Sequence, residues 1–347
     1  MIKKLSLFNF SFFGAAALLL TSSAARAGTN YSFETLNNNG DLNFNQLLGI
    51  NDSGYIAGYF GDGTVVPNNG YVLAPPYGQA NYTPENFPGS AQTQVVGIDN
   101  IKTNGTYNTV GFYVDNAGGN HGFRDFGGTF TTVDNSLTGS AMFNQVLGLN
   151  DKNIGAGFYN DSVGNAHPYL VNLTGNVTQS SFSAINLPSF FNAVSAMATD
   201  VNNSGVVSGT YTDTGGVVHG FLEIGGKFIS LDDPHGNGTN TSFFGLNNNG
   251  DVVGSFVNGN GTNGLLYNWY THTWQTIDDP NASFTSAFGV NGTTINGIND
   301  LDQMVGFYSD GTHVDGMLVN TPEPGPLALM SLGVIALGFI RRRQRKS

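Results

Sequence analysis

The sequence predicts an all-β protein, namely a six-bladed β-propeller that is closed by its N-terminal strand. Three observations lead to this prediction. A phrase made of a tight turn and a short strand occurs six times at intervals of roughly 50 residues. Each interval has room for four short strands, which is the content of a propeller blade. The strand that the last repeat lacks is found at the start of the repeat region.

The first recurring phrase places an Asn/Asp-rich turn before a short strand that contains a glycine. It runs from Gly49 to Tyr59 in the first copy and from Gly245 to Ser255 in the fifth. Asn and Gly accept the positive φ that tight hairpins require. The second copy is longer because residues 102–108 are inserted in it. The glycine near the end of each copy is Gly58, Gly111, Gly157, Gly209, Gly254 or Gly306.

Two further phrases complete each unit. One begins a strand with Gly or Pro and a large apolar residue, as in Gly122-Phe123. The other places an aromatic residue four positions before Asp or Asn, as in Phe130 to Asp134. The phrases together predict four antiparallel strands in each unit. In the third unit these are residues 145–149, 155–159, 169–172 and 182–185.

The two ends of the repeat region fit together as a ring. The sixth unit has no aromatic-to-Asn strand after Met317 and Leu318, whereas Phe33 to Asn37 supplies one near the start of the chain. We expect this strand to be the outermost one of the sixth blade. Closure of the ring would hide open sheet edges, which otherwise promote aggregation. One domain is therefore predicted over residues 31–320; a linear solenoid is the alternative architecture.

The units also resemble the HAF-type extracellular repeats of secreted bacterial proteins. The turn phrase, the Gly-Phe-Leu strand and the aromatic-to-Asp strand carry this resemblance, which covers about residues 31–320. It implies a secreted repeat protein without an assigned chemistry.

The first 27 residues have the features of a secretory signal peptide. Lys3 and Lys4 precede an apolar stretch over residues 5–20, and Ala25 and Ala27 form a small-x-small cleavage site. We expect cleavage before Gly28. An uncleaved membrane anchor is the alternative.

Residues 321–347 combine three parts in a fixed order. Pro322-Glu323-Pro324 comes first, residues 327–340 are apolar, and an Arg cluster follows at Arg341, Arg342 and Arg343. The segment resembles the PEP-CTERM sorting signal of exported proteins from Gram-negative bacteria that make exopolysaccharide. The resemblance implies a transmembrane helix that tethers the protein to the membrane and an exosortase-type peptidase that processes it. The protein would then reach the cell surface or the biofilm matrix. A plain single-pass tail anchor is the alternative.

The charge of the repeat region excludes several partners. The whole chain has 12 Lys and Arg residues against 24 Asp and Glu residues. Between the two terminal segments only Lys102, Arg124, Lys152 and Lys227 are basic, whereas all acids except Glu323 lie there, for a net charge near −19. Four cations cannot form a phosphate-binding surface, so no nucleic acid partner is expected.

Few residues suggest chemistry. His121, His167 and His219 share one repeat position, which favours a structural role over a metal site. The adjacent pairs Asp232-Asp233 and Asp278-Asp279 are repeated turn residues rather than a catalytic pair. Asn/Asp-rich loops such as residues 37–41 and 299–302 offer oxygen atoms for weak calcium binding at most, and no other cofactor is expected. There is no Cys, no Gly-x-Ser-x-Gly motif and no phosphate-binding loop.

Trp269 and Tyr270 break the repeat pattern, and are therefore the candidate ligand contacts. We expect the first strand of each blade to line the channel. Ligands are expected on the face formed by the longer second-to-third-strand and blade-to-blade loops, and the tight-turn face is expected to have little room for a pocket.

The predicted function is that of an exported, non-catalytic binding or scaffold protein at the cell surface or in the extracellular matrix. Exopolysaccharide is the candidate partner. The net charge favours neutral glycans, or anionic glycans bridged by cations. The alternative is a propeller enzyme, a glycosidase or lyase, that acts on the same matrix.

Overall fold

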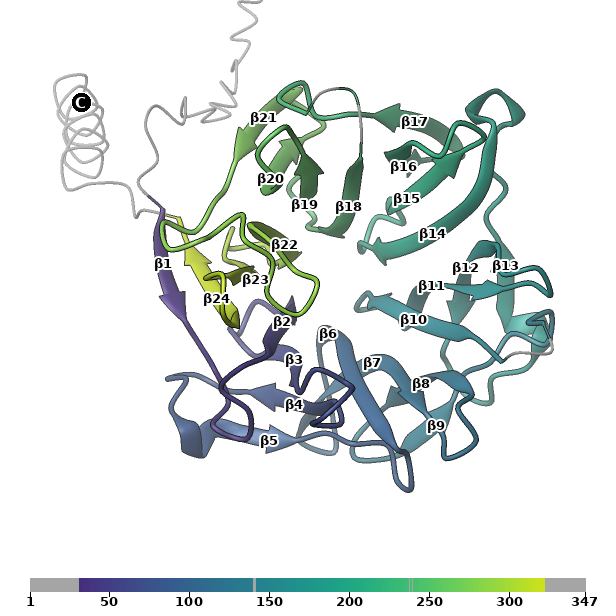
Figure 1. The fold of residues 1–347 in the computed structure, drawn as a ribbon. Coiled ribbons are helices and arrows are strands. Elements are labelled where there is room, and N and C mark those ends of the chain that lie inside the picture. Colours follow the sequence, from purple (N-terminus) through teal and green to yellow (C-terminus); the bar gives the residue numbers. More distant parts are fainter. Residues whose placement is uncertain (1–30, 140–141, 237, 239, 322–347) are drawn as a thin grey trace, which may run out of the picture.

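A computed structural model describes residues 31–139, 142–236, 238 and 240–321. These residues form six four-stranded antiparallel sheets, which are arranged like blades around a common axis (Figure 1). The predicted six-bladed β-propeller is thus confirmed. The signal-peptide and sorting-signal residues, including Ala25, Ala27, Pro322, Glu323, Pro324 and Arg341 to Arg343, lie outside the described residues.

Each sheet runs from an inner strand beside the channel to an outer strand at the rim. The sheets of blades 1 to 3 contain β2 (Asn45–Ile50), β3 (Ile56–Phe60), β4 (Asn69–Leu73) and β5 (Tyr82–Pro84); β6 (Gln92–Thr103), β7 (Thr106–Val114), β8 (Asn120–Asp125) and β9 (Phe130–Thr132); and β10 (Asn144–Leu149), β11 (Ile154–Asn160), β12 (Ala166–Asn172) and β13 (Phe182–Ala184). Those of blades 4 to 6 contain β14 (Ala193–Val201), β15 (Val207–Asp213), β16 (Val218–Ile224) and β17 (Lys227–Leu231); β18 (Thr241–Leu246), β19 (Asp251–Val257), β20 (Thr262–Asn268) and β21 (Thr273–Thr276); and β22 (Thr293–Ile298), β23 (Met304–Ser309), β24 (Val314–Asn320) and β1 (Ser32–Thr35). Three 3₁₀ turns occur in the connections, at η1 (Gln79–Asn81), η2 (Gln179–Ser181) and η3 (Ser189–Phe191).

The N-terminal strand closes the ring as the sequence predicts. Strand β1 pairs antiparallel with β24, with Glu34 opposite Leu318 and Thr35 opposite Met317. The contact continues beyond the strand, because the Leu36 N–H donates to the Gly316 carbonyl at 2.8 Å. Asn37 Oδ1 accepts the Gly316 N–H at 3.0 Å. The two ends of the repeat region therefore share one blade (Figure 1).

The recurring glycine of the second strand is required by a close approach within each blade. A Cβ at Gly157 would lie 2.1 Å from the Gln145 carbonyl oxygen and 3.0 Å from the Tyr169 ring, and the equivalent glycines meet the inner-strand carbonyl at 1.9–2.4 Å. A β-bulge in every inner strand lies next to this contact, at Leu147 in the third blade. The glycine is therefore a packing requirement of the blade.

We expect Gly157→Ala to destabilise the protein by about 1–3 kcal/mol or more, because a backbone carbonyl cannot move aside without displacing the inner strand. Thermal or urea unfolding measures this effect. Gly78→Ala is the control, since Gly78 has a φ of −75° and its nearest contact is the Asn81 side chain at 3.3 Å. Equal stability of the two variants would contradict the packing explanation.

The core lies between neighbouring sheets. The large residue that begins each third strand is fully buried there, as for Tyr71, Phe123, Tyr169 and Phe221. One cluster joins Val110 of blade 2 to Val146 and Tyr169 of blade 3, and similar clusters join other pairs of adjacent blades. The blades are thus held together by apolar packing, and the ring forms a rigid frame for the loops and the channel.

The alternation of strands gives the ring two different faces. The first-to-second-strand turns lie on one face, which we call the turn face. The second-to-third-strand and blade-to-blade connections lie on the other, which we call the loop face. Among the described residues, no helix has the length and apolar character that crossing a bilayer demands.

Candidate functional site

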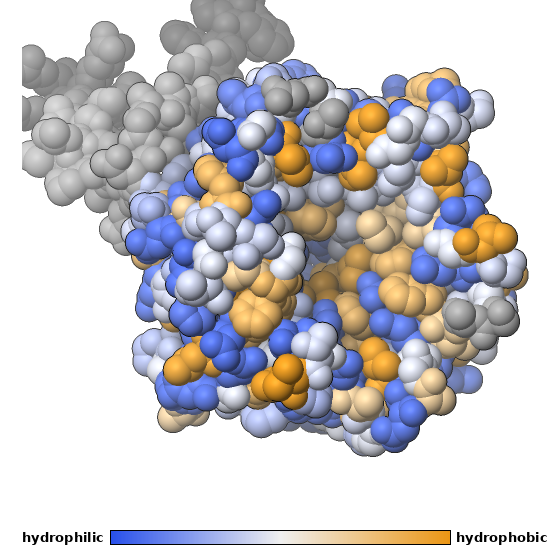
Figure 2. Space-filling model, in the orientation of Figure 1, coloured by the Kyte–Doolittle hydropathy of each residue, from blue (hydrophilic) through white to orange (hydrophobic). Residues whose placement is uncertain are grey.

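The central channel contains a cavity of about 310 Å³, whose walls are the six inner strands. This volume lies at the lower end of the range of small-molecule pockets. Figure 2 shows that the molecule is hollowed at its centre and that apolar side chains gather inside the hollow. The prediction that the first strand of each blade lines the channel is confirmed.

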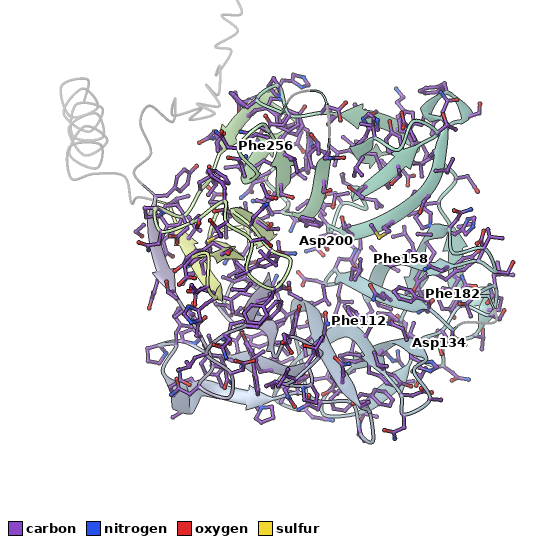
Figure 3. The ribbon with its side chains drawn as sticks, viewed as in Figure 1. Phe112, Asp134, Phe158, Phe182, Asp200 and Phe256 are labelled. Atoms are coloured by element: carbon purple, nitrogen blue, oxygen red, sulfur yellow. The ribbon has the colours of Figure 1, made fainter. Side chains whose placement is uncertain are left out.

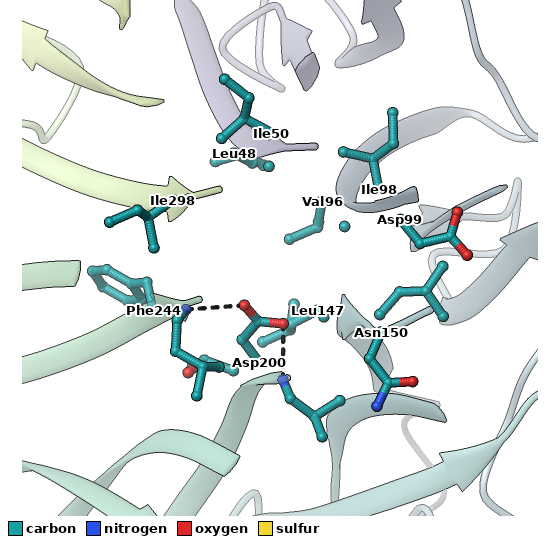
Figure 4. Close-up of a pocket in the computed structure, with 18 of the residues that line it drawn as sticks. Leu48, Ile50, Val96, Ile98, Asp99, Leu147, Asn150, Asp200, Phe244 and Ile298 are labelled. Carbon is teal, nitrogen blue, oxygen red and sulfur yellow. Dashed lines mark hydrogen bonds between the residues drawn. The ribbon is translucent and has the colours of Figure 1, made fainter. Parts of the chain in front are cut away.

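Successive residues of each inner strand form layers across the channel. The bulge residues make the wall of one layer, as with Leu48, Val96, Leu147 and Phe244 (Figure 4). The next layer, which we call the apolar ring, is formed by Ile50, Ile98, Leu149, Val201, Leu246 and Ile298. Phe112 and Phe158 add aromatic rings from the second strands of blades 2 and 3 (Figure 3). The middle of the channel is therefore largely apolar.

A ring of side-chain amides follows on the side of the turn face. This amide ring consists of Asn51, Asp99, Asn150, Asn202, Asn247 and Asn299. Each Asn donates from Nδ2 to the backbone carbonyl of the equivalent residue in the next blade, at 2.9–3.1 Å. Asp99 has no amide donor, so the link from blade 2 to blade 3 is missing from this otherwise continuous circle.

A second ring, the turn ring, is formed by the residues that follow: Asp52, Asn100, Asp151, Asn203, Asn248 and Asp300. The backbone N–H of each donates to the side-chain Oδ1 of its equivalent in the next blade, at 2.8–3.0 Å. All six links are present. The Asn and Asp residues of the repeat phrase therefore join the blades at the turn face, in addition to forming their own turns.

Asp200 breaks the symmetry of the channel. The position after the bulge is glycine in the other five blades, at Gly49, Gly97, Gly148, Gly245 and Gly297. Asp200 Oδ1 accepts the Val201 N–H at 2.8 Å, and Oδ2 accepts the Leu246 N–H of blade 5 at 3.1 Å (Figure 4). Burial raises the pKa of Asp200 to about 7. A carboxyl group in such surroundings is a candidate functional group.

The other acids of the channel belong to the two rings. Burial raises the pKa of Asp99 to about 7, although Asp99 Oδ1 accepts the Ile101 N–H and Oδ2 accepts an Asn108 amide hydrogen. Burial also raises the pKa of Asp52, and the charges of Asp300 and Asp151 add to the effect. In the part of the chain that the structure describes, five Asp residues line the channel and no Lys, Arg or His does.

The prediction that the tight-turn face has little room for a pocket is wrong. The turns are tight, yet the residues that begin them project toward the axis and enclose one end of the cavity. Sequence reasoning also missed Asp200. Its signal is present in the repeat, because the phrase starts with Gly in every copy except the fourth, which starts with Asp200.

The repeated histidines lie on the loop face and pair with acids of their own blade. His167 Nε2 lies 2.9 Å from Asp161, and His219 Nδ1 lies 2.9 Å from Asp232. His121 is 2.6 Å from Asp134, and its ring stacks on Tyr113. The described residues contain no group of three or more His, Cys, Asp or Glu side chains that could hold a metal ion. Each repeated histidine thus contacts an acid of its own blade, and a structural role for these histidines stays a prediction.

The two candidate ligand contacts, Trp269 and Tyr270, differ in solvent exposure. Trp269 is buried in the core cluster between blades 4 and 5, with 9% of its surface exposed, whereas Tyr270 is 68% exposed and packs over Gly250. Neither residue lines the channel. The paired acids are occupied locally: Asp278 Oδ1 accepts the Gly264 N–H, and Asp279 Oδ1 accepts the Asn281 N–H.

The resemblance of the C-terminal segment to a PEP-CTERM sorting signal is confirmed by comparison with protein families. Residues 320–345 match the PEP-CTERM protein-sorting motif. This motif indicates export and sorting to the cell surface. It contains Pro322, Glu323, Pro324, Arg341, Arg342 and Arg343. No curated protein matches the chain.

Several solved structures are similar in arrangement. The SapL1 lectin in complex with alpha methyl fucoside is 11% identical, with a TM-score of 0.47 over 81% of this chain and 93% of that one. The Aleuria aurantia lectin, described as a six-bladed β-propeller, is 11% identical, with a TM-score of 0.45 over 86% and 97%. TolB from Acinetobacter baumannii is 12% identical, with a TM-score of 0.45 over 80% and 63%. Similarity at this level says nothing about what this chain binds.

Proposed function

We propose that the propeller is a non-catalytic binding module that acts outside the cell, with a glycan of the extracellular matrix as its ligand and the channel as its binding site. The observation that carries the proposal is the cavity itself. It has a mostly apolar wall, polar groups at fixed positions and a rigid frame, which are the features of a small-ligand site.

The two polar rings support binding rather than turnover. In the turn ring, Asp52, Asp151 and Asp300 accept backbone N–H groups of neighbouring blades, so their oxygen atoms already serve the structure. A sugar residue that entered from the loop face would meet the side chains of Gln46, Gln94 and Gln145 before the apolar ring. Amide groups of this kind hydrogen-bond to hydroxyl groups without a net charge.

A glycan array on residues 28–320, read with and without calcium, tests the proposal. Leu147→Trp fills the channel, and Val163→Trp is the matched control because Val163 is 79% exposed on the loop face. We expect Leu147→Trp alone to abolish glycan binding. Loss of binding in Val163→Trp alone would move the site to the loop surface, and an array without any bound glycan would overturn the proposal.

A glycosidase or lyase remains the second candidate, because one observation favours it. Asp99 and Asp200 have carboxyl pKa values near 7, as a general acid requires. Release of new chain ends from a bound glycan, lost in Asp200→Asn, would establish this activity. Glycan binding without new chain ends would establish the binding module instead.

Replacement of Arg341, Arg342 and Arg343 by Gln is expected to disturb membrane retention before sorting, since positive residues hold a helix end on the cytoplasmic side. Fractionation of cells that express the variant, with the wild-type chain beside it, measures the effect.

We also propose cleavage near Pro322-Glu323-Pro324 by an exosortase-type peptidase. Mass spectrometry that finds Ser347 in the surface-associated protein would contradict cleavage and favour a plain anchor.

A further inference from the structure

We infer that the channel recognises a protonated primary amine on a body about as large as a monosaccharide, with Asp200 as the group that pairs with the amine. The inference rests on the proposed function in that it uses the same channel. It adds that the ligand is cationic, whereas the net charge of the chain alone favours neutral glycans or anionic glycans bridged by cations.

The position of Asp200 is the first step. The carboxyl group lies in the channel wall between the apolar ring and the bulge layer, where the other five blades have no side chain. Its two hydrogen bonds, from the Val201 and Leu246 N–H groups, fix its orientation. A carboxylate has about four acceptor positions, so acceptor capacity remains for a donor in the channel. The Asp200 carboxyl group thus has a fixed orientation and can accept further hydrogen bonds from a ligand.

One residue that lines the channel has an unpaired acceptor. Asn296 is the bulge residue of blade 6 and lines the cavity. Its Oδ1 is shielded from solvent and has no hydrogen-bond partner among the described residues. This atom is closed off from the cavity, so the acceptors that a ligand in the channel can meet are those of Asp200 and the other lining carboxyl groups. An ammonium group has three N–H donors and no acceptor, which matches an acceptor-rich wall.

The electrostatics of the channel select the same ligand. The five Asp residues of its lining face no Lys, Arg or His among the described channel residues. Phe112, Phe158 and Phe244 add aromatic rings, which attract cations when water is excluded. A hydrated metal ion would gain little from the apolar ring, whereas an organic amine can bury its body there while its charge meets Asp200. Amino sugars and alkylamines share this chemistry.

Calorimetric titration of the propeller with four probes tests the inference: glucosamine, N-acetylglucosamine, cyclohexylamine and tetramethylammonium. We expect the two primary amines to bind and the neutral acetylated sugar to bind at least tenfold more weakly. Tetramethylammonium, which has charge but no N–H donor, should also be weaker. Asp200→Gly should lose at least tenfold in amine affinity and should fold, because it restores the residue of the other five blades.

Glu34→Gln is the matched control, since it removes one charge from an exposed position on the outer strand β1. Amine binding that is unchanged in Asp200→Gly, or no amine binding at all, would overturn the inference. Equal binding of glucosamine and N-acetylglucosamine would overturn it while leaving glycan binding intact. Binding of cyclohexylamine but of neither sugar would support the inference and contradict the proposed glycan function.

Affinity for cyclohexylamine should rise between about pH 6 and pH 8, because Asp200 loses its proton in this range while an alkylamine stays charged. Neither β10 nor β18, which pack against Asp200, carries a charged residue. The remaining titratable groups of the channel are Asp52, Asp99, Asp151 and Asp300. A rise that persists in Asp200→Gly would assign the effect to those groups and overturn the role of Asp200.

Discussion

A chain that starts at Asp41 is expected to aggregate, whereas one that starts at Tyr31 should remain a folded monomer. The shorter chain lacks β1, so β24 becomes an open edge with the sequence Val314–Asn320, in which six of seven residues are buried in the closed ring. It also loses Leu36, which is buried against Leu47 and Leu318 in the blade 6 to blade 1 contact. An unpaired apolar edge of this kind invites pairing with other chains.

Size-exclusion chromatography and thermal unfolding of the two chains measure the effect. Addition of a synthetic peptide of residues 31–40 provides a specific control, because a free strand can add to an exposed sheet edge. The peptide should restore the monomer. If the chain that starts at Asp41 is monomeric and melts at the same temperature as the longer one, the N-terminal strand does not close the ring.

Closure could be predicted from the sequence because it depends on local phrases whose partners are equivalent in every blade. The Asp or Asn that ends the fourth-strand phrase accepts the N–H of the glycine that begins the third strand. This contact joins Asn86 to Gly70, and Asp278 to Gly264. In the sixth blade Asn37 makes the same contact with Gly316 across almost the whole chain. The repeat therefore contains the information for closing the ring.

The channel could not be predicted in the same way. Its lining depends on which inner-strand residues face the axis. Side chains of a regular strand point alternately to its two sides, and a β-bulge at residues such as Leu147 shifts this alternation within the strand. The repeat phrase shows Asn-Asp turns, but not that Asn51 and Asp52 contact the next blade. Such contacts join residues about 50 positions apart, beyond any local pattern. Asp200 departs from the phrase, and only its position in the channel gives that departure a meaning.

The sequence alone also could not predict which of the two candidate ligand contacts is exposed to solvent. Trp269 and Tyr270 are adjacent and both break the repeat pattern, yet one is buried and the other exposed. The Trp269 backbone N–H donates to the Gly250 carbonyl, which extends the pairing of β19 and β20 by one residue. The Trp269 ring then points into the blade. A break in a repeat therefore identifies unusual positions without separating core residues from contacts. As ligand contacts, both residues stay predictions.

Stability is expected to fall by several kcal/mol as the pH rises from about 5 to about 8, because two channel carboxyls hold their protons only in the folded state. Burial raises the pKa of both Asp99 and Asp200 from 3.8 to about 7. Between these values the folded protein binds more protons than the unfolded chain, so the free energy of unfolding decreases with pH. One pKa unit corresponds to ~1.4 kcal/mol. Channel water reduces the effect, which leaves roughly 1–2 kcal/mol for each group.

Two substitutions test this origin without removing the fold, because each introduces the residue that the other five blades carry. Asp99→Asn supplies the amide type that the amide ring lacks at this position, and Asp200→Gly removes the second carboxyl. The double variant should be more stable than the wild type at pH 8 and should show a flatter dependence on pH in urea unfolding. Glu34→Gln removes one carboxylate, as each of the two substitutions does, but at an exposed position, and should keep the original slope. A double variant with the wild-type slope would show that the dependence arises from other carboxyls, such as Glu85, whose pKa burial raises to about 7 and which is unchanged in the variant.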